Sequence, residues 1–179
     1  MPRFVAFLRA INVGGHTVAM SALRKHFEEA GCFDVETVIA SGNVLFGSSS
    51  RSAAVLEKRI AAHLEHRLGY AVATFLRTPV ELASIAAHRP FARSDAERPG
   101  CSLYVAFHSR SADATARRRV FGLASDIDEL RMRGREIYWL CRGRSNDSKI
   151  YGGGLEKALG QPATLRNATT VRKIAEILA

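Results

Sequence analysis

Two groups of polar residues have the types and the spacing that suit anion binding. The first group follows an apolar run and combines a guanidinium, two carboxamides, a hydroxyl and unhindered glycine backbone. We name it the first polar cluster, and its members are Arg9, Asn12, Gly14, Gly15, Ser41, Gly42 and Asn43. Such donors, together with exposed backbone N–H groups, hold small anions and other polar ligands.

The second group lies near the C-terminus, at the expected starts of two helices. This second polar cluster consists of Ser148, Lys149, Arg166, Asn167, Thr169 and Lys173. Helix N-termini attract anions, so the predicted partner of both clusters is a small anionic ligand. A purely structural interpretation stands beside this one, because glycine-rich turns and Asn or Thr caps also serve loops and helix ends.

Other chemistry has less support in the sequence. Gly14-Gly15 follows a strand but matches neither the dinucleotide-binding nor the P-loop fingerprint, so no cofactor is assigned. No Ser or Cys has a base at a recognisable spacing, so no catalytic residue is named and enzyme activity is left open. His63 and His66 have no further ligand at a suitable spacing, so we expect surface residues and no metal site.

The elements that must position these residues occur in a repeated order. The first half has the order βαββαβ. Its strand-like runs lie at 4–9, 35–40, 43–46 and 71–77, and its helical spacing at 20–30 and 52–68. Thr78-Pro79-Val80-Glu81 begins a further helix with a capping box.

The second half repeats the pattern. Strands are expected at 102–108, 130–132, 137–141 and 163–166, and helices at 113–124, 148–159 and 171–178. The repeat predicts an α+β fold of two ferredoxin-like (βαββαβ) subdomains, each an antiparallel sheet of order 4-1-3-2 with helices on one face. The predicted subdomains are 1–89 and 101–179, joined by a linker at 90–100 that is rich in Pro, Gly and charge.

This topology predicts which loops meet. The first strand should run antiparallel to the third, so its end at Arg9 should lie beside Asn43, which completes the first polar cluster. The same reasoning places Ser148 and Lys149 beside Arg166 and Asn167 in the second half.

The composition is that of a soluble globular protein. The 179 residues are 47% hydrophobic and 24% charged, and no apolar run is long enough for a membrane span or a signal segment. We therefore expect a cytoplasmic location and no membrane partner. Cys32, Cys101 and Cys141 are odd in number and widely spaced, which indicates free thiols.

The charge gives an alternative function. Lys and Arg number 26 against 17 Asp and Glu, and this excess of +9 would suit nucleic acid. The arginines are scattered, however, and 43–46 lacks the aromatic pattern of RNA-binding sheets. A third reading is a protein-interaction module with a large apolar surface patch. The sequence assigns no oligomeric state.

Four motifs carry a resemblance to a known family. LRAINVGG at 8–15, SGNVLF at 41–46, SKI at 148–150 and ATLRNATTVRKIAE at 163–176 resemble the domain of unknown function 1697 family over essentially the whole chain. The resemblance implies a bacterial protein with two ferredoxin-like subdomains and implies no activity. The family usually has Gly in place of Ala10 and Trp in place of Ala168, and Gly152-Gly153-Gly154 should weaken a helix by about 0.8–1 kcal/mol per glycine.

Overall fold

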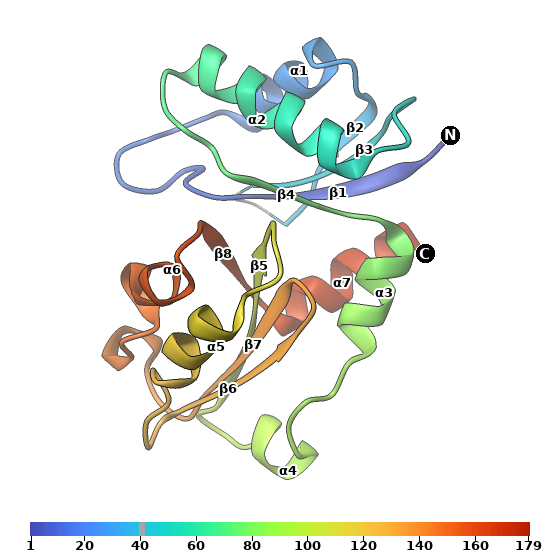
Figure 1. Cartoon of the computed structure of the whole chain (residues 1–179). Helices are drawn as coiled ribbons and strands as arrows, with labels where there is room; N and C mark the ends of the chain where they lie inside the picture. The colour runs from blue at the N-terminus through green and yellow to red at the C-terminus, as the bar shows by residue number, and fades with distance from the viewer. Residues whose placement is uncertain (40–41) are drawn as a thin grey trace. The chain divides into compact units, whose positions relative to one another are not determined.

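A computed structural model describes residues 1–39 and 42–179 (Figure 1). The chain divides into two compact units, Met1–Ser84 with Ile174–Ala179, and Ile85–Lys173. The division falls within two helices, α3 (Pro79–Ala87) and α7 (Ala168–Leu178). Within the described ranges, no helix has both the length and the apolar character that crossing a bilayer requires.

The first unit is built on one four-stranded antiparallel sheet. Its elements are, in chain order, β1 (Arg3–Leu8), α1 (Met20–Glu29), β2 (Phe33–Thr37), β3 (Asn43–Gly47), α2 (Ala53–Leu68) and β4 (Thr74–Arg77). The strand order is β2-β3-β1-β4, which is the predicted order read from the other edge. In the register of β1 with β3, Phe7 lies opposite Asn43.

Both faces of this sheet are apolar. Phe4, Ala6 and Leu8 alternate along β1 and pack with the buried side chains of α1 and α2, which cover that face (Figure 1). Val5 and Phe7 point to the opposite face and are also fully buried. Strands buried on both faces read as continuous hydrophobic runs, which is why residues 4–8 contain no polar residue.

The caps predicted from the sequence are present. The Ser52 hydroxyl accepts a hydrogen bond from the Val55 amide at 3.3 Å and begins α2. Thr78 and Glu81 form the reciprocal capping box of α3, with the Thr78 amide donating to Glu81 Oε2 at 2.8 Å and the Glu81 amide donating to Thr78 Oγ1 at 3.2 Å. Such caps contribute about 1 kcal/mol each to helix stability.

The second unit repeats the architecture. Its elements are α4 (Arg93–Ala96), β5 (Ser102–His108), α5 (Ala114–Phe121), β6 (Asp128–Arg133), β7 (Glu136–Cys141), the 3₁₀ turns η1 (Ser145–Asp147) and η2 (Tyr151–Gly153), α6 (Gly154–Leu159) and β8 (Ala163–Asn167). The strand order β6-β7-β5-β8 matches that of the first sheet. The predicted α+β class with two ferredoxin-like units is confirmed.

One face of the second sheet is covered by α5 and α6. Val120 of α5 and Leu155 and Leu159 of α6 pack there against Ile137 and Trp139. The other face carries Leu103, Val105 and Tyr138, which lie against the end of α3 and the first turn of α7. The start of α7 therefore packs on this face near Leu103, at the beginning of β5.

The helix predicted at 148–159 is wrong in its first half, because α6 begins only at Gly154. Gly152 and Gly153 adopt positive φ angles of +69° and +99°, which lie outside the helical region. A Cβ at residue 154 would lie 1.7 Å from the Lys149 carbonyl oxygen, so only glycine fits this close approach. Gly152 and Gly153 form a tight connection that precedes the helix, and Gly154 is its first residue.

Some other boundaries also differ from the predicted ones. The segment expected as a linker at 90–100 contains the short helix α4, and Phe91 within it is buried. The second strand was predicted at 35–40 and lies at Phe33–Thr37. The fourth was predicted at 71–77 and spans only Thr74–Arg77. The helix predicted at 113–124 is Ala114–Phe121, because the Asp113 side chain caps its first turn.

Candidate functional site

The two loops of the first polar cluster lie side by side, as predicted. The Leu8 amide donates a hydrogen bond to the Gly42 carbonyl at 2.8 Å, and Asn43 pairs with Phe7 in the sheet. Gly42 has a φ of +85°, and a Cβ there would lie 3.2 Å from Leu8 Cβ. The close approach of these loops therefore depends on the glycine.

Both carboxamides of this cluster hold the loops together. Asn43 is buried, and its Nδ2 donates to the carbonyls of Val38 and Ile39, each at 3.2 Å. Asn12 Oδ1 accepts a hydrogen bond from the Val18 amide at 2.7 Å. The described contacts of Asn12 and Asn43 thus fix the backbone around the cluster.

Three further members of the first polar cluster are exposed to solvent. Arg9, Gly14 and Gly15 are exposed, and the Arg9 amide donates to the Ala73 carbonyl at 2.9 Å. Ser41 lies outside the described residues. Ligand binding at this cluster stays a prediction.

The second polar cluster is divided between the two faces of its sheet. The buried Ser148 hydroxyl accepts a hydrogen bond from the Ile150 amide at 3.0 Å, and Ile150 packs into the core beneath α5 and α6. Leu165 packs against the same core, so Arg166, the next residue on β8, points to the opposite face. The structure therefore does not bring Ser148 and the exposed Lys149 together with Arg166.

Arg166 is engaged within its own strand. Its Nη1 donates to Thr164 Oγ1 at 2.8 Å and to the Leu165 carbonyl at 2.9 Å. Desolvation of the guanidinium lowers its pKa to about 10. Arg166 stays charged at neutral pH and positions the end of β8.

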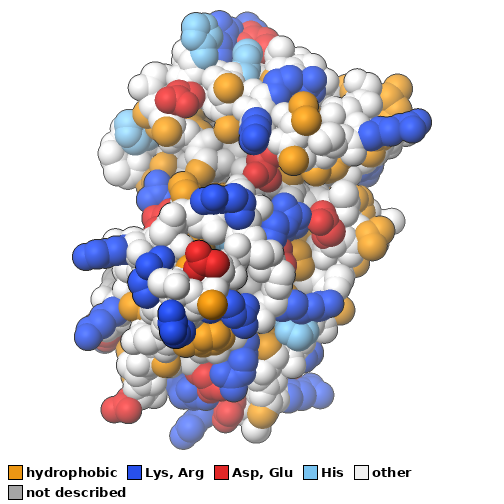
Figure 2. Space-filling model, viewed as in Figure 1, with side chains coloured by type: hydrophobic (Ala, Val, Ile, Leu, Met, Phe, Trp, Pro, Cys, Tyr) orange, Lys and Arg blue, Asp and Glu red, His pale blue; other side chains and the backbone are white. Residues whose placement is uncertain are grey.

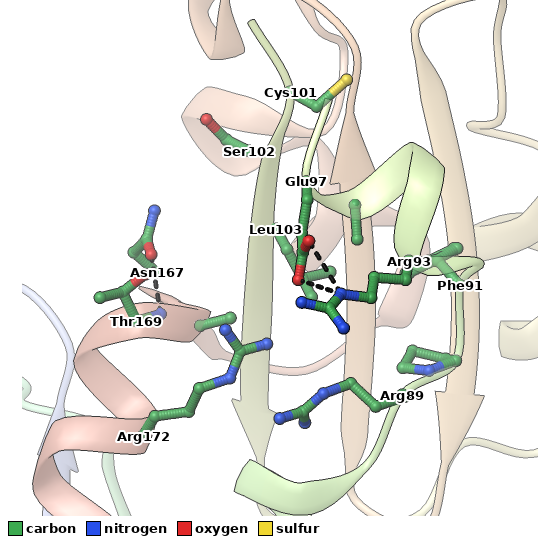
Figure 3. Close-up of a pocket in the computed structure, with 13 residues that line it drawn as sticks. Arg89, Phe91, Arg93, Glu97, Cys101, Ser102, Leu103, Asn167, Thr169 and Arg172 are labelled. Atoms are coloured by element: carbon green, nitrogen blue, oxygen red, sulfur yellow. Dashed lines mark hydrogen bonds and ion pairs between the residues drawn. The ribbon is translucent and has the colours of Figure 1, made fainter. Parts of the chain in front are cut away.

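Asn167 and Thr169 line a cavity of about 520 Å³ in the second unit (Figure 3). The pairing of Asn167 with Tyr104 brings the end of β8 beside the start of β5, and the segment that contains α4 closes the cavity. Its lining consists of Arg89, Pro90, Phe91, Arg93, Ala96, Glu97, Cys101, Ser102, Leu103, Asn167, Ala168, Thr169 and Arg172. Lys173 is exposed and is not part of this lining.

Three arginines from two chain segments point into the same space. Arg89 and Arg93 come from the α4 segment, and Arg172 lies one helical turn after Thr169 on α7 (Figure 3). Arg93 Nε donates to both carboxylate oxygens of Glu97 at 2.9 Å. Glu97 is the single carboxylate among the residues that line the cavity, so the lining carries a net positive charge.

Arg172 is the arginine of this cavity whose side chain has an unpaired buried donor among the described residues. Its Nε is buried and has no hydrogen-bond partner in the described part of the chain. Burial lowers the pKa of Arg172, the positive charge of Arg89 lowers it further, and Glu97 opposes both effects. Arg89 is anchored differently, because its Nη1 donates to the carbonyls of Ala86 at 2.6 Å and His88 at 3.1 Å. An anion beside Arg172 would offset the repulsion between Arg172 and Arg89. It would also accept a hydrogen bond from the buried Nε of Arg172.

The rest of the lining combines apolar side chains with a hydroxyl and a thiol. Phe91 and Leu103 supply an apolar wall, and Ser102 and Cys101 lie half-buried at the start of β5. Among these lining residues, no histidine stands beside either nucleophile as a base would. Ala168 also lines the cavity with a small apolar side chain.

Of the residues that line this cavity, Asn167 and Thr169 were predicted from the sequence, whereas its three arginines were not. Arg89 and Arg93 border or fall within the segment treated as a linker, so their side chains were not assigned to any surface. A usable signal existed on α7, because Arg172 follows Thr169 at a spacing of three residues, which places both on one helix face.

Comparison with known proteins identifies the family and the fold. The solved structure of the conserved bacterial protein SP0830 from Streptococcus pneumoniae is similar, with a TM-score of 0.80 and 22% sequence identity over 99% of this chain and 98% of that chain. No curated protein matches the sequence. The model of the family described as Protein of unknown function (DUF1697) matches residues 1–138. The chain therefore belongs to the DUF1697 family.

Proposed function

We propose that this protein binds a small anionic molecule in the cavity of its second unit. One observation carries the proposal: the guanidinium groups of Arg89, Arg93 and Arg172 converge on a cavity whose lining offers only Glu97 as a counter-charge. Guanidinium groups bind phosphate and carboxylate through paired, charge-assisted hydrogen bonds. The first turn of α7 adds the positive end of its helix dipole.

The shape of the cavity narrows the class of ligand. Its volume of about 520 Å³ falls within the range of small-molecule sites, and Phe91 and Leu103 add apolar side chains to its lining. An organic phosphate or carboxylate with an apolar part fits this combination better than a bare inorganic ion. The three free cysteines support the cytoplasmic location that we infer for this activity.

Nucleic acid is a less suitable partner. On the face shown in Figure 2, Lys and Arg side chains are interspersed with Asp and Glu and form no continuous stripe. Binding to nucleic acid usually follows a clustered basic surface that tracks the phosphate backbone. The mixed charge pattern on this face therefore supports a small anion held at one point more than a nucleic-acid strand.

The test uses two anions and a neutral control. Inorganic phosphate, phenyl phosphate and phenol are titrated into the full chain at constant ionic strength, by thermal shift and then by calorimetry. We expect phenyl phosphate to raise the melting temperature most, phosphate to raise it less, and phenol to leave it unchanged. Arg172→Ala and Arg89→Ala should each weaken phenyl phosphate binding by about tenfold or more.

Arg98→Ala is the matched control, because Arg98 belongs to the same segment, is exposed and does not line the cavity. It should bind phenyl phosphate as the unmodified chain does. The proposal fails if neither anion binds, or if Arg172→Ala and Arg98→Ala behave alike. A single-stranded oligonucleotide that binds with a steep salt dependence while phenyl phosphate does not would instead favour nucleic acid.

A further inference from the structure

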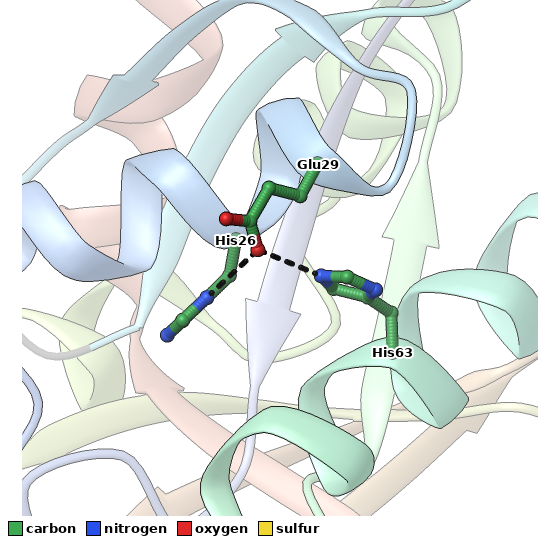
Figure 4. A group of neighbouring side chains, drawn as sticks. All are labelled: His26, Glu29 and His63. Carbon is green, nitrogen blue, oxygen red and sulfur yellow. Dashed lines mark ion pairs between the residues drawn. The ribbon is translucent and has the colours of Figure 1, made fainter.

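Two histidines and a glutamate from neighbouring helices meet on the surface of the first unit. His26 and Glu29 are three residues apart on α1, and His63 lies on α2 (Figure 4). Glu29 Oε2 is 3.6 Å from His26 Nδ1 and 3.4 Å from His63 Nε2. One ligand atom from each side chain lies within 4.8 Å of the other two.

The two imidazole nitrogens that face Glu29 make ion-pair contacts with it but no hydrogen bond of good geometry. His26 Nδ1 and His63 Nε2 are buried atoms with no hydrogen-bond partner in the described part of the chain. Each faces the carboxylate only at ion-pair distance. Buried polar atoms are normally hydrogen-bonded, so two such nitrogens directed at one carboxylate call for an explanation.

A bound cation supplies that explanation. In tetrahedral zinc sites the ligand atoms lie about 2.0–2.1 Å from the metal and hence about 3.3 Å from one another. Two of the three ligand–ligand distances, 3.4 and 3.6 Å, already approach this value. The third pair, the two imidazole nitrogens, lies within 4.8 Å.

We propose that His26, Glu29 and His63 form a binding site for Zn²⁺ or a similar late first-row divalent ion. Two imidazoles and one carboxylate are the donor set that zinc prefers, whereas Mg²⁺ and Ca²⁺ require oxygen ligands. The three side chains are 15%, 27% and 24% exposed, so the ion can enter from solvent and keep a water as its fourth ligand.

Arg67 orients the carboxylate. Its Nη2 lies 2.8 Å from Glu29 Oε1 and 2.7 Å from Oε2. With an ion at Oε2, the guanidinium would keep its bond to Oε1 and hold the ligand in place, as outer partners of metal ligands do. Its positive charge also limits the affinity of the site, so binding in the micromolar range is the expected outcome.

The sequence predicts no metal site here, because His63 and His66 have no further ligand at a suitable spacing. His66 is exposed and does not belong to this group. The other two ligands, His26 and Glu29, come from α1, which lies more than thirty positions before His63. Only the packing of α1 against α2 brings the donors together.

The experiment titrates Zn²⁺ into the full chain, prepared without a histidine tag and treated with chelator. Calorimetry should show one ion per chain, and Zn²⁺ should raise the melting temperature while Mg²⁺ does not. Co²⁺ should give the intense visible absorption of a four-coordinate site. His26→Ala, Glu29→Gln and His63→Ala should each weaken Zn²⁺ binding by about tenfold or more.

Two neighbouring substitutions serve as matched controls. His66→Ala lies on the same helix as His63, and Glu28→Gln adjoins Glu29, and both should bind Zn²⁺ as the unmodified chain does. Circular dichroism confirms that each variant folds, and His63→Gln replaces His63→Ala if that variant does not. Absence of saturable binding up to millimolar Zn²⁺, or an equal loss in His66→Ala and His63→Ala, overturns the proposal. Either result leaves the anion site untouched, because its residues belong to the second unit.

Discussion

Asn167 accepts a hydrogen bond from the Thr169 amide at 2.9 Å, so these two residues cap α7 and at the same time form one wall of the arginine-lined cavity. The side-chain oxygen of Asn167 satisfies one of the donors that the first turn of a helix leaves open. The cap thus fixes where α7 begins and, one turn later, where Arg172 points.

Loss of this cap should lower stability. Asn167→Ala removes the acceptor and should reduce the free energy of unfolding by about 1 kcal/mol, measured by urea denaturation. Asn167→Ser retains a side-chain oxygen at the cap and should recover most of this loss. Equal stabilities of the two variants would show that the hydrogen bond does not contribute.

Removal of the single carboxylate in the cavity should strengthen anion binding. Glu97→Gln releases Arg93 from its ion pair and removes a negative charge that repels the ligand. We expect phenyl phosphate to bind about three- to tenfold more tightly, by calorimetry at low ionic strength. The pair is 86% and 64% exposed, so the substitution should change stability by less than about 1 kcal/mol. Weaker binding in Glu97→Gln would contradict the assigned electrostatics.

Cys101 offers a chemical probe of the cavity. It lines the cavity and is half-exposed, whereas Cys32 and Cys141 are buried. Burial raises the pKa of Cys32 to about 11 and also raises that of Cys141, so both stay protonated and slow to react. At pH 8 the neutral reagent iodoacetamide should modify Cys101 first, as followed by mass spectrometry. Saturating phenyl phosphate should slow this reaction severalfold, and an unchanged rate would place the anion elsewhere.

Much of the fold could be predicted from the sequence, because the relevant signals are local. Ser52 and the Thr78–Glu81 pair mark helix starts through side chain–backbone bonds within a few residues, and these starts were placed correctly. The repeated order of strands and helices then gave both sheet orders. Handedness and short connections leave few alternatives for such a repeat.

The candidate site was less accessible to the same reasoning. Asn12 and Asn43 are predicted ligand groups, and the structure adds that their carboxamides also bind backbone groups of the loops, a role that depends on the folded geometry. Arg89 and Arg172 are more than eighty positions apart and meet only because β8 pairs with β5. Side-chain convergence over such separations leaves no trace in residue spacing.

Ala10 has a backbone conformation that is unfavourable for a residue with a side chain. Its φ of +64° lies in the left-handed region, where a non-glycine residue is strained by about 1–2 kcal/mol. Ala10→Gly removes this strain but raises the conformational entropy of the unfolded chain. We expect a net gain of about 0.5–1 kcal/mol in the free energy of unfolding. Ala54→Gly in α2 is the control and should lose about 1 kcal/mol, and a loss in both variants would refute the strain at Ala10.

Glu129 should make stability depend on pH in the acid range. A hydrogen bond from Arg142 and the charges of Arg131 and Arg142 hold the pKa of Glu129 below its ordinary value of 4.5, although burial acts in the opposite direction. A carboxyl whose pKa is lower in the folded state stabilises the fold above the unfolded value and loses this effect as pH falls through the folded value. A double-mutant cycle of Glu129→Gln and Arg142→Ala, with urea denaturation at pH 7 and at intervals down to pH 3, measures the coupling.

The coupling between Glu129 and Arg142 should be about 0.5–1 kcal/mol at pH 7, because both side chains are partly exposed and solvent screens the pair. It should decline below about pH 4.5, as protonation of Glu129 removes the charge on which the pair depends. High salt should weaken it at pH 7 for the same reason that exposed pairs are screened. A coupling that stays constant from pH 7 to pH 3 would mean that packing of the two side chains, and not their charge, joins β6 to the segment that follows β7.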